Sequence, residues 1–124
     1  MKIRIQRNSI RFRLTRSEVV LLKKNGSHRE QTAFNGKSFG YAVVAKEGIT
    51  QLEAEFHEDT ITLFLPKTES KKWPDSEQVG YENKMVLKDG QLLNLLLEKD
   101  FVCLDDRTED QSDQYPNPAA TTKT

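Results

Sequence analysis

The chain has 124 residues, of which 35% are hydrophobic and 31% are charged, with 19 basic and 19 acidic side chains. This length fits one domain, and the single cysteine excludes a fold held together by internal disulfides. No run approaches the roughly 18 to 20 apolar residues of a membrane-spanning helix, so we expect a cytoplasmic protein with no membrane partner.

Charge is distributed unevenly along the chain. Residues 1–29 contain nine Lys or Arg and one acidic residue, whereas residues 98–113 contain seven acidic residues and two basic ones. Such an asymmetry between the two ends indicates either an oppositely charged partner or neutralisation within the molecule.

The first residues predict a β-hairpin. Residues 2–6 and 9–14 alternate polar and apolar side chains with period two, which is typical of half-buried strands. Arg7 and Asn8 between them predict a two-residue turn, and this turn sets the pairing of the two strands.

A short helix is predicted over residues 16–24. Thr15 and Glu18 have the spacing of a capping box, in which each side chain accepts a hydrogen bond from the backbone of the other residue. Gly26 follows the apolar run and supplies a left-handed stop.

The middle of the chain predicts more strands and a second helical segment. Residues 66–73 predict one or two helical turns, because Pro66 suits the first turn of a helix. The predicted strands lie in pairs on either side of short turns, at residues 30–34, 39–45, 51–57 and 61–65.

Asp89 and Gly90 predict a hairpin between residues 81–87 and 91–97. The leucine-rich second arm also suits a helix that begins at Asp89, but apolar residues on both faces favour a strand buried on two sides. Residues 91–97 are therefore interpreted as a strand, with the helix as the alternative.

Together these elements predict one α+β domain over residues 1–104. Its sheet is expected to be mainly antiparallel, either curved and open or partly closed into a barrel, with one short helix and one helical turn. Residues 105–124 are acidic and contain proline, which predicts an extended or disordered tail.

The predicted hairpin places four cations on one face of the sheet. Lys2 lies opposite Arg13 and Arg4 lies opposite Arg11, if residues 7 and 8 form the turn. Like charges directly opposite each other destabilise a sheet by up to about 1 kcal/mol per pair, so this face requires anions.

Three sources of these anions remain open. A neighbouring strand that carries Glu53 and Glu55 would neutralise the face within a purely structural domain. Alternatively, the arginines bind an anionic small molecule or an acidic peptide. In the third case the acidic tail folds back over the hairpin, and the residues proposed for this contact are Asp105, Asp110, Asp113 and Tyr115.

An Arg-x-Arg strand that faces a Glu-x-Glu strand inside a barrel is similar to the triphosphate tunnel enzymes. In that family, cations hold the phosphates and paired acids hold a metal. The resemblance implies a metal-dependent enzyme acting on phosphorylated small molecules, with Glu53 and Glu55 on the metal side. The Glu-x-Glu pair lies in mid-chain here and continues to His57, where the family has lysine.

Other chemistries have little support in the sequence. His28 and His57 have no metal-ligand companion at the usual spacing, and Cys103 between Val102 and Leu104 is interpreted as a buried thiol. Signatures of phosphate loops, dinucleotide binding and hydrolases are missing, so we expect no cofactor and no resident metal. Nucleic acid is not expected as a partner, because no base-reading motif occurs.

Motifs at both ends of the chain resemble a family of short bacterial proteins of unknown function. One motif comprises residues 2–5, 8–15 and 17–19, and the other comprises residues 98–105 and 109–118. The resemblance implies a single-domain bacterial protein and brings no activity with it. We therefore expect a non-enzymatic binding or interaction module whose basic hairpin face meets an anionic group.

Overall fold

The computed structural model describes residues 1–101. The predictions for residues 105–124, and the one for Cys103, lie outside this range. In chain order the elements are β1 (Lys2–Gln6), β2 (Ser9–Leu14), α1 (Arg16–Asn25), β3 (Ser27–Phe34), β4 (Lys37–Lys46), β5 (Glu53–His57), β6 (Thr60–Pro66), α2 (Lys67–Lys72), the 3-10 turn η1 (Trp73–Asp75), β7 (Gly80–Val86) and β8 (Leu92–Lys99).

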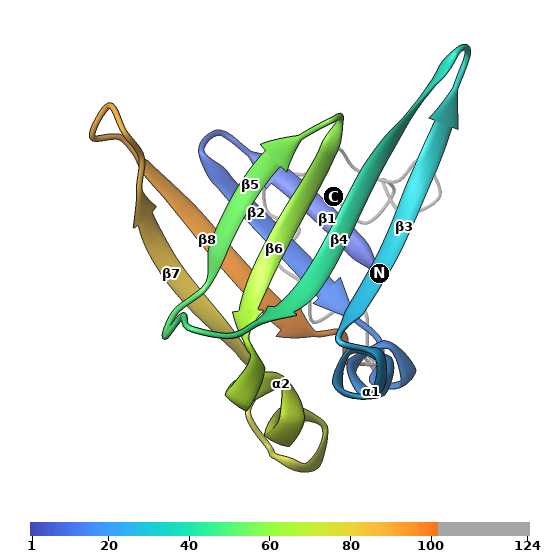
Figure 1. Ribbon diagram of the computed structural model, residues 1–124, viewed down its shortest axis with the longest axis vertical. Helices are drawn as coiled ribbons and strands as arrows, with labels where there is room; N and C mark the ends of the chain where they lie inside the picture. The colour runs from blue at the N-terminus through green and yellow to red at the C-terminus, as the bar shows by residue number, and fades with distance from the viewer. Residues whose placement is uncertain (102–124) are drawn as a thin grey trace, which may run out of the picture.

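The strands form two four-stranded sheets that face each other (Figure 1). Sheet A has the order β1-β2-β8-β7, and sheet B has the order β3-β4-β6-β5. The outer pairs of each sheet are antiparallel hairpins, whereas the central pairs β2·β8 and β4·β6 are parallel. The prediction of an α+β fold with mainly antiparallel strands is confirmed, but the strands divide between two sheets and neither closes into a barrel.

The local predictions are confirmed at the helix and at the last strand. The capping box of α1 is formed, since the Thr15 hydroxyl accepts from the Glu18 backbone N–H and Glu18 accepts from the Thr15 N–H at 2.8 Å. Gly26 ends the helix with a φ of 80°, the left-handed conformation that glycine adopts without strain. The segment that also suited a helix is strand β8, with both Leu95 and Leu97 fully buried.

The described chain consists of two halves with the same connectivity. Each half is a hairpin, a helix and a second hairpin, namely β1–β2, α1 and β3–β4 in the first half and β5–β6, α2 and β7–β8 in the second. The first hairpin of one half lies in the same sheet as the second hairpin of the other, so exchanging the halves exchanges sheet A with sheet B. The fold therefore has an internal two-fold repeat.

Strand registers support this equivalence residue by residue. Gln6 pairs with Ser9 across one two-residue turn, as His57 pairs with Thr60 across the other. In the parallel pairs, Ser9 lies opposite Asn94 and Thr60 lies opposite Gly40. The repeat is not visible in the sequence, because equivalent positions carry different side chains: Lys2 and Arg4 of β1 correspond to Glu53 and Glu55 of β5.

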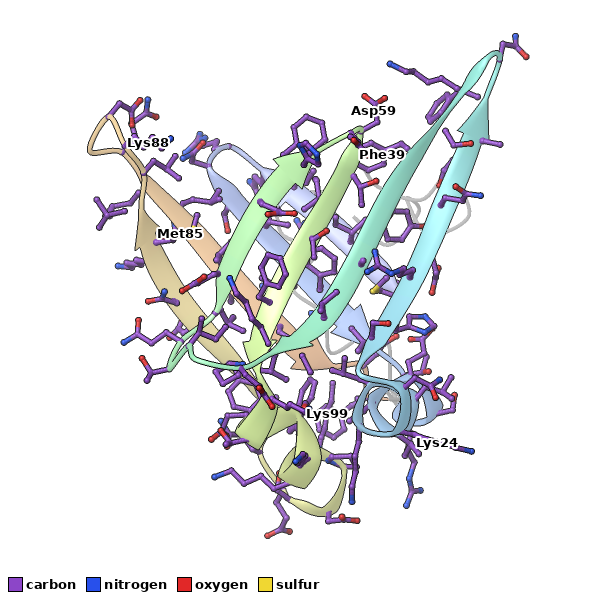
Figure 2. The ribbon with its side chains drawn as sticks, in the orientation of Figure 1. Lys24, Phe39, Asp59, Met85, Lys88 and Lys99 are labelled. Atoms are coloured by element: carbon purple, nitrogen blue, oxygen red, sulfur yellow. The ribbon has the colours of Figure 1, made fainter. Side chains whose placement is uncertain are left out.

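The core lies nearer the helical end of the two sheets. Both helices connect one sheet to the other at this end (Figure 1). Trp73 is fully buried there, and its indole N–H donates to the carbonyl of Gln78 at 2.8 Å. Figure 2 shows Lys99 at the helical end and Asp59 at the opposite end. The buried apolar core comprises Ile10, Phe12, Leu14, Val19, Leu22, Val43, Leu52, Ile61, Leu63, Leu65, Trp73, Leu95 and Leu97.

Candidate functional site

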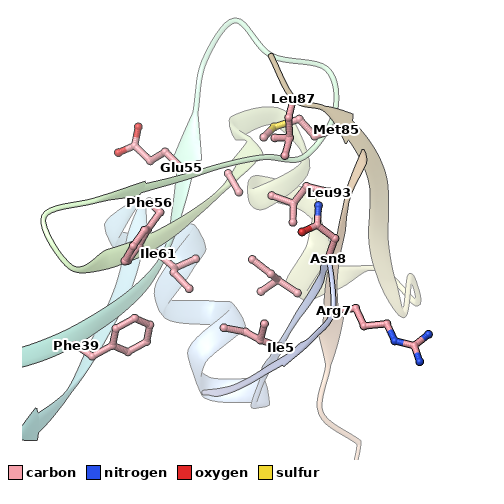
Figure 3. A pocket seen from close by; sticks show the side chains of 12 residues that line it. Ile5, Arg7, Asn8, Phe39, Glu55, Phe56, Ile61, Met85, Leu87 and Leu93 are labelled. Carbon is pink, nitrogen blue, oxygen red and sulfur yellow. The ribbon is translucent and has the colours of Figure 1, made fainter. Parts of the chain in front are cut away.

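A cleft of about 520 Å³ lies between the two sheets, and its lining includes the β1–β2 turn at the end away from the helices. Its lining is predominantly apolar, and among residues 1–101 the polar side chains that line it are those of Arg7, Asn8 and Glu55. Figure 3 shows the Arg7 and Glu55 side chains projecting away from this space on opposite sides. The apolar residues that line it include Ile5, Ile10, Phe39, Phe56, Ile61 and Leu93.

The two halves of the chain contribute equivalent positions to the cleft. Ile10 in the first half corresponds to Ile61 in the second half. Each is the second residue of the strand that follows its two-residue turn. Ile5 corresponds to Phe56 in the same way, because Ile5 pairs with Ile10 and Phe56 pairs with Ile61. The cleft is therefore centred where the two halves of the repeat meet.

Two apolar side chains at the mouth of the cleft are largely exposed. Ile5 is 55% exposed and Phe56 is 67% exposed, although both belong to the inward-facing set of their strands. The ring of Phe39 lies 6.4 Å from that of Phe56 and continues the apolar surface inward. Adjoining exposed apolar side chains in a concave surface are a mark of ligand-binding sites, because their burial by a ligand is favourable.

The β1–β2 turn at the rim of the cleft contains a left-handed residue, as does the equivalent β5–β6 turn. Arg7 has a φ of 52°, and Glu58 at the equivalent position has a φ of 51°. Residues other than glycine, asparagine and aspartate rarely adopt this conformation, which costs free energy of folding. A hydrogen bond fixes the β1–β2 turn against the start of β8, because the Asn8 side-chain amide donates to the Leu92 carbonyl at 2.7 Å.

The basic hairpin has the predicted register, with Lys2 opposite Arg13 and Arg4 opposite Arg11. These four cations lie on the outer face of sheet A, since the alternate residues Phe12 and Leu14 are buried in the core. The strand next to the hairpin is β8.

Two acids from the end of β8 neutralise part of this face. The same oxygen of Glu98 lies 3.5 Å from the guanidinium Nε of both Arg11 and Arg13. The Asp100 carboxylate lies 3.2 Å from the Lys2 ammonium. Within residues 1–101, Arg4 makes no ion pair.

The expected role of Glu53 and Glu55 is corrected by the topology. Both residues lie on β5, an edge strand of sheet B. A carboxylate oxygen of Glu53 lies 3.6 Å from the ammonium of Lys46 at the end of β4, in the same sheet. They do not neighbour the basic hairpin. The space between the sheets is apolar, so the cationic and acidic strands do not face each other across a lumen as in the triphosphate tunnel enzymes. No local pattern in the sequence specifies that β5 and the basic hairpin belong to different sheets.

A second polar cluster connects the start of β1 with β3 and α1. The α-ammonium of Met1 donates to Glu18 at 2.6 Å and to Glu30 at 2.9 Å, and the same two carboxylate oxygens lie 3.3 and 2.9 Å from Nε2 of His28. Burial would raise the pKa of Glu18, but hydrogen bonds from the ammonium and from the Thr15 backbone outweigh it and lower the pKa to about 2.

The donor atoms of Glu18, His28 and Glu30 lie within 4.8 Å of one another, which is compatible with a metal ion. The Met1 ammonium already satisfies both carboxylates, and they in turn raise its pKa despite its burial. The arrangement is that of an ion-paired contact between β1 and β3. The sequence offered His28 no metal-ligand companion at the usual spacing, but its side chain is only 18% exposed and lies beside these acids. The signal in the sequence was its two-residue spacing from Glu30, which places both on one face of a strand.

Comparisons with known proteins identify a family but no activity. Among residues 1–101, no helix has both the length and the apolar composition needed to cross a membrane. Neither a curated protein nor a solved structure matches the chain. Residues 1–119 match the family of unknown function DUF7009, as the end motifs had indicated, and the chain belongs to that family.

Proposed function

We propose that this protein is a non-enzymatic binding module whose cleft takes a small, slender apolar ligand such as an acyl chain. The observation that carries the proposal is the apolar cleft of about 520 Å³ at the open end of the two sheets. This volume lies within the range of roughly 300 to 1,000 Å³ that is typical of small-molecule sites.

The composition of the cleft favours binding over catalysis. Its titratable side chains, Arg7 and Glu55, project away from the space on opposite sides and do not form an acid–base pair within it (Figure 3). An apolar group can enter between the sheets while a polar end of the same molecule remains in water at the mouth. A chain-like amphiphile meets both conditions.

Exposed side chains at the mouth supply the driving force. Covering a large apolar side chain contributes about 1.5–3 kcal/mol when its burial is complete. Ile5 and Phe56 have most of this contribution still available, because each is more than half exposed. Both therefore belong to the expected contact surface of the ligand.

The proposal is tested by displacement of a fluorescent apolar probe, anilinonaphthalene sulfonate, with decanol as the competitor. Phe56→Ser and Ile5→Ser are each expected to weaken decanol binding about tenfold, which corresponds to a loss of about 1.4 kcal/mol. The matched controls are Phe34→Ser and Val86→Ser, since Phe34 is 64% exposed and Val86 is 68% exposed and neither lines the cleft.

Equal decanol affinities for the wild type and all four variants would overturn the proposal, as would failure of decanol to displace the probe. Circular dichroism of each variant checks that the fold is retained. Because the substituted side chains are exposed, their loss is expected to leave the folded state intact.

We further place the protein in the bacterial cytoplasm. The end motifs resemble those of short bacterial proteins, and the single cysteine allows no internal disulfide, as is usual for proteins of the cytosol. Fractionation of bacterial cells that express the chain, followed by immunoblotting of the cytosolic and membrane fractions, tests this placement.

A further inference from the structure

The outer face of sheet A carries more positive charge than its counter-ions neutralise. Four cations from β1 and β2 share this face, and within residues 1–101 they meet two carboxylates. Glu98 is divided between Arg11 and Arg13, at 3.5 Å from each. The face therefore retains unneutralised positive charge, and the Arg4–Arg11 pair lies nearer the β1–β2 turn than the Lys2–Arg13 pair.

Both carboxylates come from the beginning of the acidic segment of the chain. Glu98 and Asp100 are the first two of the seven acids in residues 98–113, and both already contact the basic face. Their side chains are 27% and 20% exposed, so these contacts are partly sheltered from water and salt. The segment that carries the complementary charge thus begins on this face.

The path of the chain allows the remaining acids to reach the same face. The Asp100 backbone N–H donates to the Leu14 carbonyl at 2.8 Å, which fixes the chain at the end of β2 beside Lys2. Asp105 follows five residues later and can extend about 17 Å from that point. The Arg4–Arg11 pair lies two residues along the strands from the Lys2–Arg13 pair, on the same face of the sheet. The two pairs are therefore about 7 Å apart.

We propose that the outer face of sheet A is a docking surface for an acidic peptide, and that its occupant is residues 105–113 of this chain. Asp105, Asp106, Glu109, Asp110 and Asp113 supply carboxylates that pair with Arg4 and share Arg11 and Arg13 with Glu98. This inference is independent of the cleft, which opens between the sheets and not on their outer faces.

A spin label in the acidic segment tests the docking directly. The full-length chain with Cys103→Ser and Ser112→Cys is labelled at position 112, and paramagnetic broadening of backbone amide signals is recorded by NMR. At low salt the signals of Arg4 and Arg11 are expected to lose most of their intensity, whereas those of Glu53 and Glu55 on β5, the edge of sheet B away from β3, keep theirs. About 1 M salt, where the screening length falls to about 3 Å, is expected to restore the lost signals.

A neutralised tail provides the second measurement. The full-length variant carries Asp105→Asn, Asp106→Asn, Glu109→Gln, Asp110→Asn and Asp113→Asn. Tripolyphosphate is titrated as a free anion that competes for the face. If the tail covers the face about nine-tenths of the time, its neutralisation raises the apparent affinity about tenfold. A control variant with the same change in charge carries Glu47→Gln, Glu58→Gln, Asp59→Asn, Asp75→Asn and Glu77→Gln, all away from this face.

The expected result is selective broadening at Arg4 and Arg11, together with tighter tripolyphosphate binding in the tail variant than in the control. Broadening that is absent, or equal on the two sheets, overturns the proposal. Equal gains in the tail and control variants also overturn it, because they would reflect total charge only. Neither result bears on decanol binding, so the proposal for the cleft and the proposal for the docking surface are tested independently.

Discussion

Glu30 on β3 and Asn83 on β7 occupy equivalent positions and hold opposite edges of the two sheets together. Glu30 accepts a hydrogen bond from the Met1 α-ammonium at 2.9 Å, whereas the Asn83 amide donates to the Leu52 carbonyl at 2.9 Å. Met1 and Leu52 are themselves equivalent, since each precedes the first strand of its half. The repeat thus extends to the polar contacts between the sheets, with donor and acceptor exchanged.

The Asn83 contact is expected to contribute measurably to stability. Asn83→Ala leaves the Leu52 carbonyl without this donor and is expected to lower the free energy of unfolding by about 1 kcal/mol. Asn83→Asp is expected to cost more, because a carboxylate would then face a carbonyl oxygen. Urea denaturation provides the measurement, and Lys84→Ala on the same strand is the control. Equal midpoints for the Asn83 and Lys84 variants would contradict the assignment.

Stability is expected to fall in acid through Glu18. The pKa of Glu18 is lowered from 4.5 to about 2 in the folded protein, so its ionised form stabilises the fold above pH 4.5. This contribution is lost progressively as the pH falls from 4.5 toward 2. Glu18→Gln is expected to cost about 1 kcal/mol at pH 6 and much less at pH 2.5.

Urea denaturation at both pH values measures this dependence. Glu58→Gln removes a carboxylate whose side chain is 84% exposed and serves as the control. A Glu18→Gln variant with the same loss of stability at both pH values would show that the ion pair with Met1 is not the source of the effect.

Arg7 is expected to be replaceable with a gain in stability. Its φ of 52° is unfavourable for arginine and is well tolerated by asparagine, so Arg7→Asn is expected to raise the free energy of unfolding by about 1 kcal/mol. Gln6→Asn alters the neighbouring strand position, which lacks a positive φ, and is expected to give no gain. Thermal melting of both variants decides the matter, and a lower midpoint for Arg7→Asn would refute the strain argument.

Gly80 is expected to be intolerant of any side chain. A Cβ at this position would collide with the Leu97 carbonyl oxygen and lie 3.0 Å from the Cα of Glu98, which belong to the adjacent strand backbone. Gly80→Ala is expected to cost about 2–3 kcal/mol. Gly40→Ala is the comparison, since its Cβ would meet the side chain of Thr60, which can rotate away. If the two variants unfold at the same urea concentration, backbone crowding at Gly80 is not limiting.

Local structure was predictable from the sequence where neighbouring residues determine it. The two-residue turn at Arg7 and Asn8 fixes the hairpin register, and alternation along each strand then fixes which side chains share a face. The capping box at Thr15 and Glu18 likewise depends on residues within one helical turn. Each of these features can be derived without knowing where the remaining chain lies.

Long-range pairing was not predictable in the same way. β2 pairs with β8 across most of the chain, and no local pattern in Ser9–Leu14 specifies Leu92–Lys99 as its neighbour. As a result Glu98, and not Glu53, became the counter-ion of the arginines. The cleft was missed for the same reason, because it exists only once two separate sheets are placed face to face.

The order in which this chain leaves the ribosome differs from the order in which its strands can pair. Each half supplies one hairpin to each sheet, so the β1–β2 hairpin receives its parallel neighbour, β8, only after all the other strands have been synthesised. Until then the edge of β2 that pairs with β8 lacks its hydrogen-bond partners. Such non-local assembly slows folding and lengthens the exposure of nascent chains to aggregation. In this interleaved two-fold architecture, the β1–β2 hairpin is therefore expected to be the part of the nascent chain that waits longest for its partner strand.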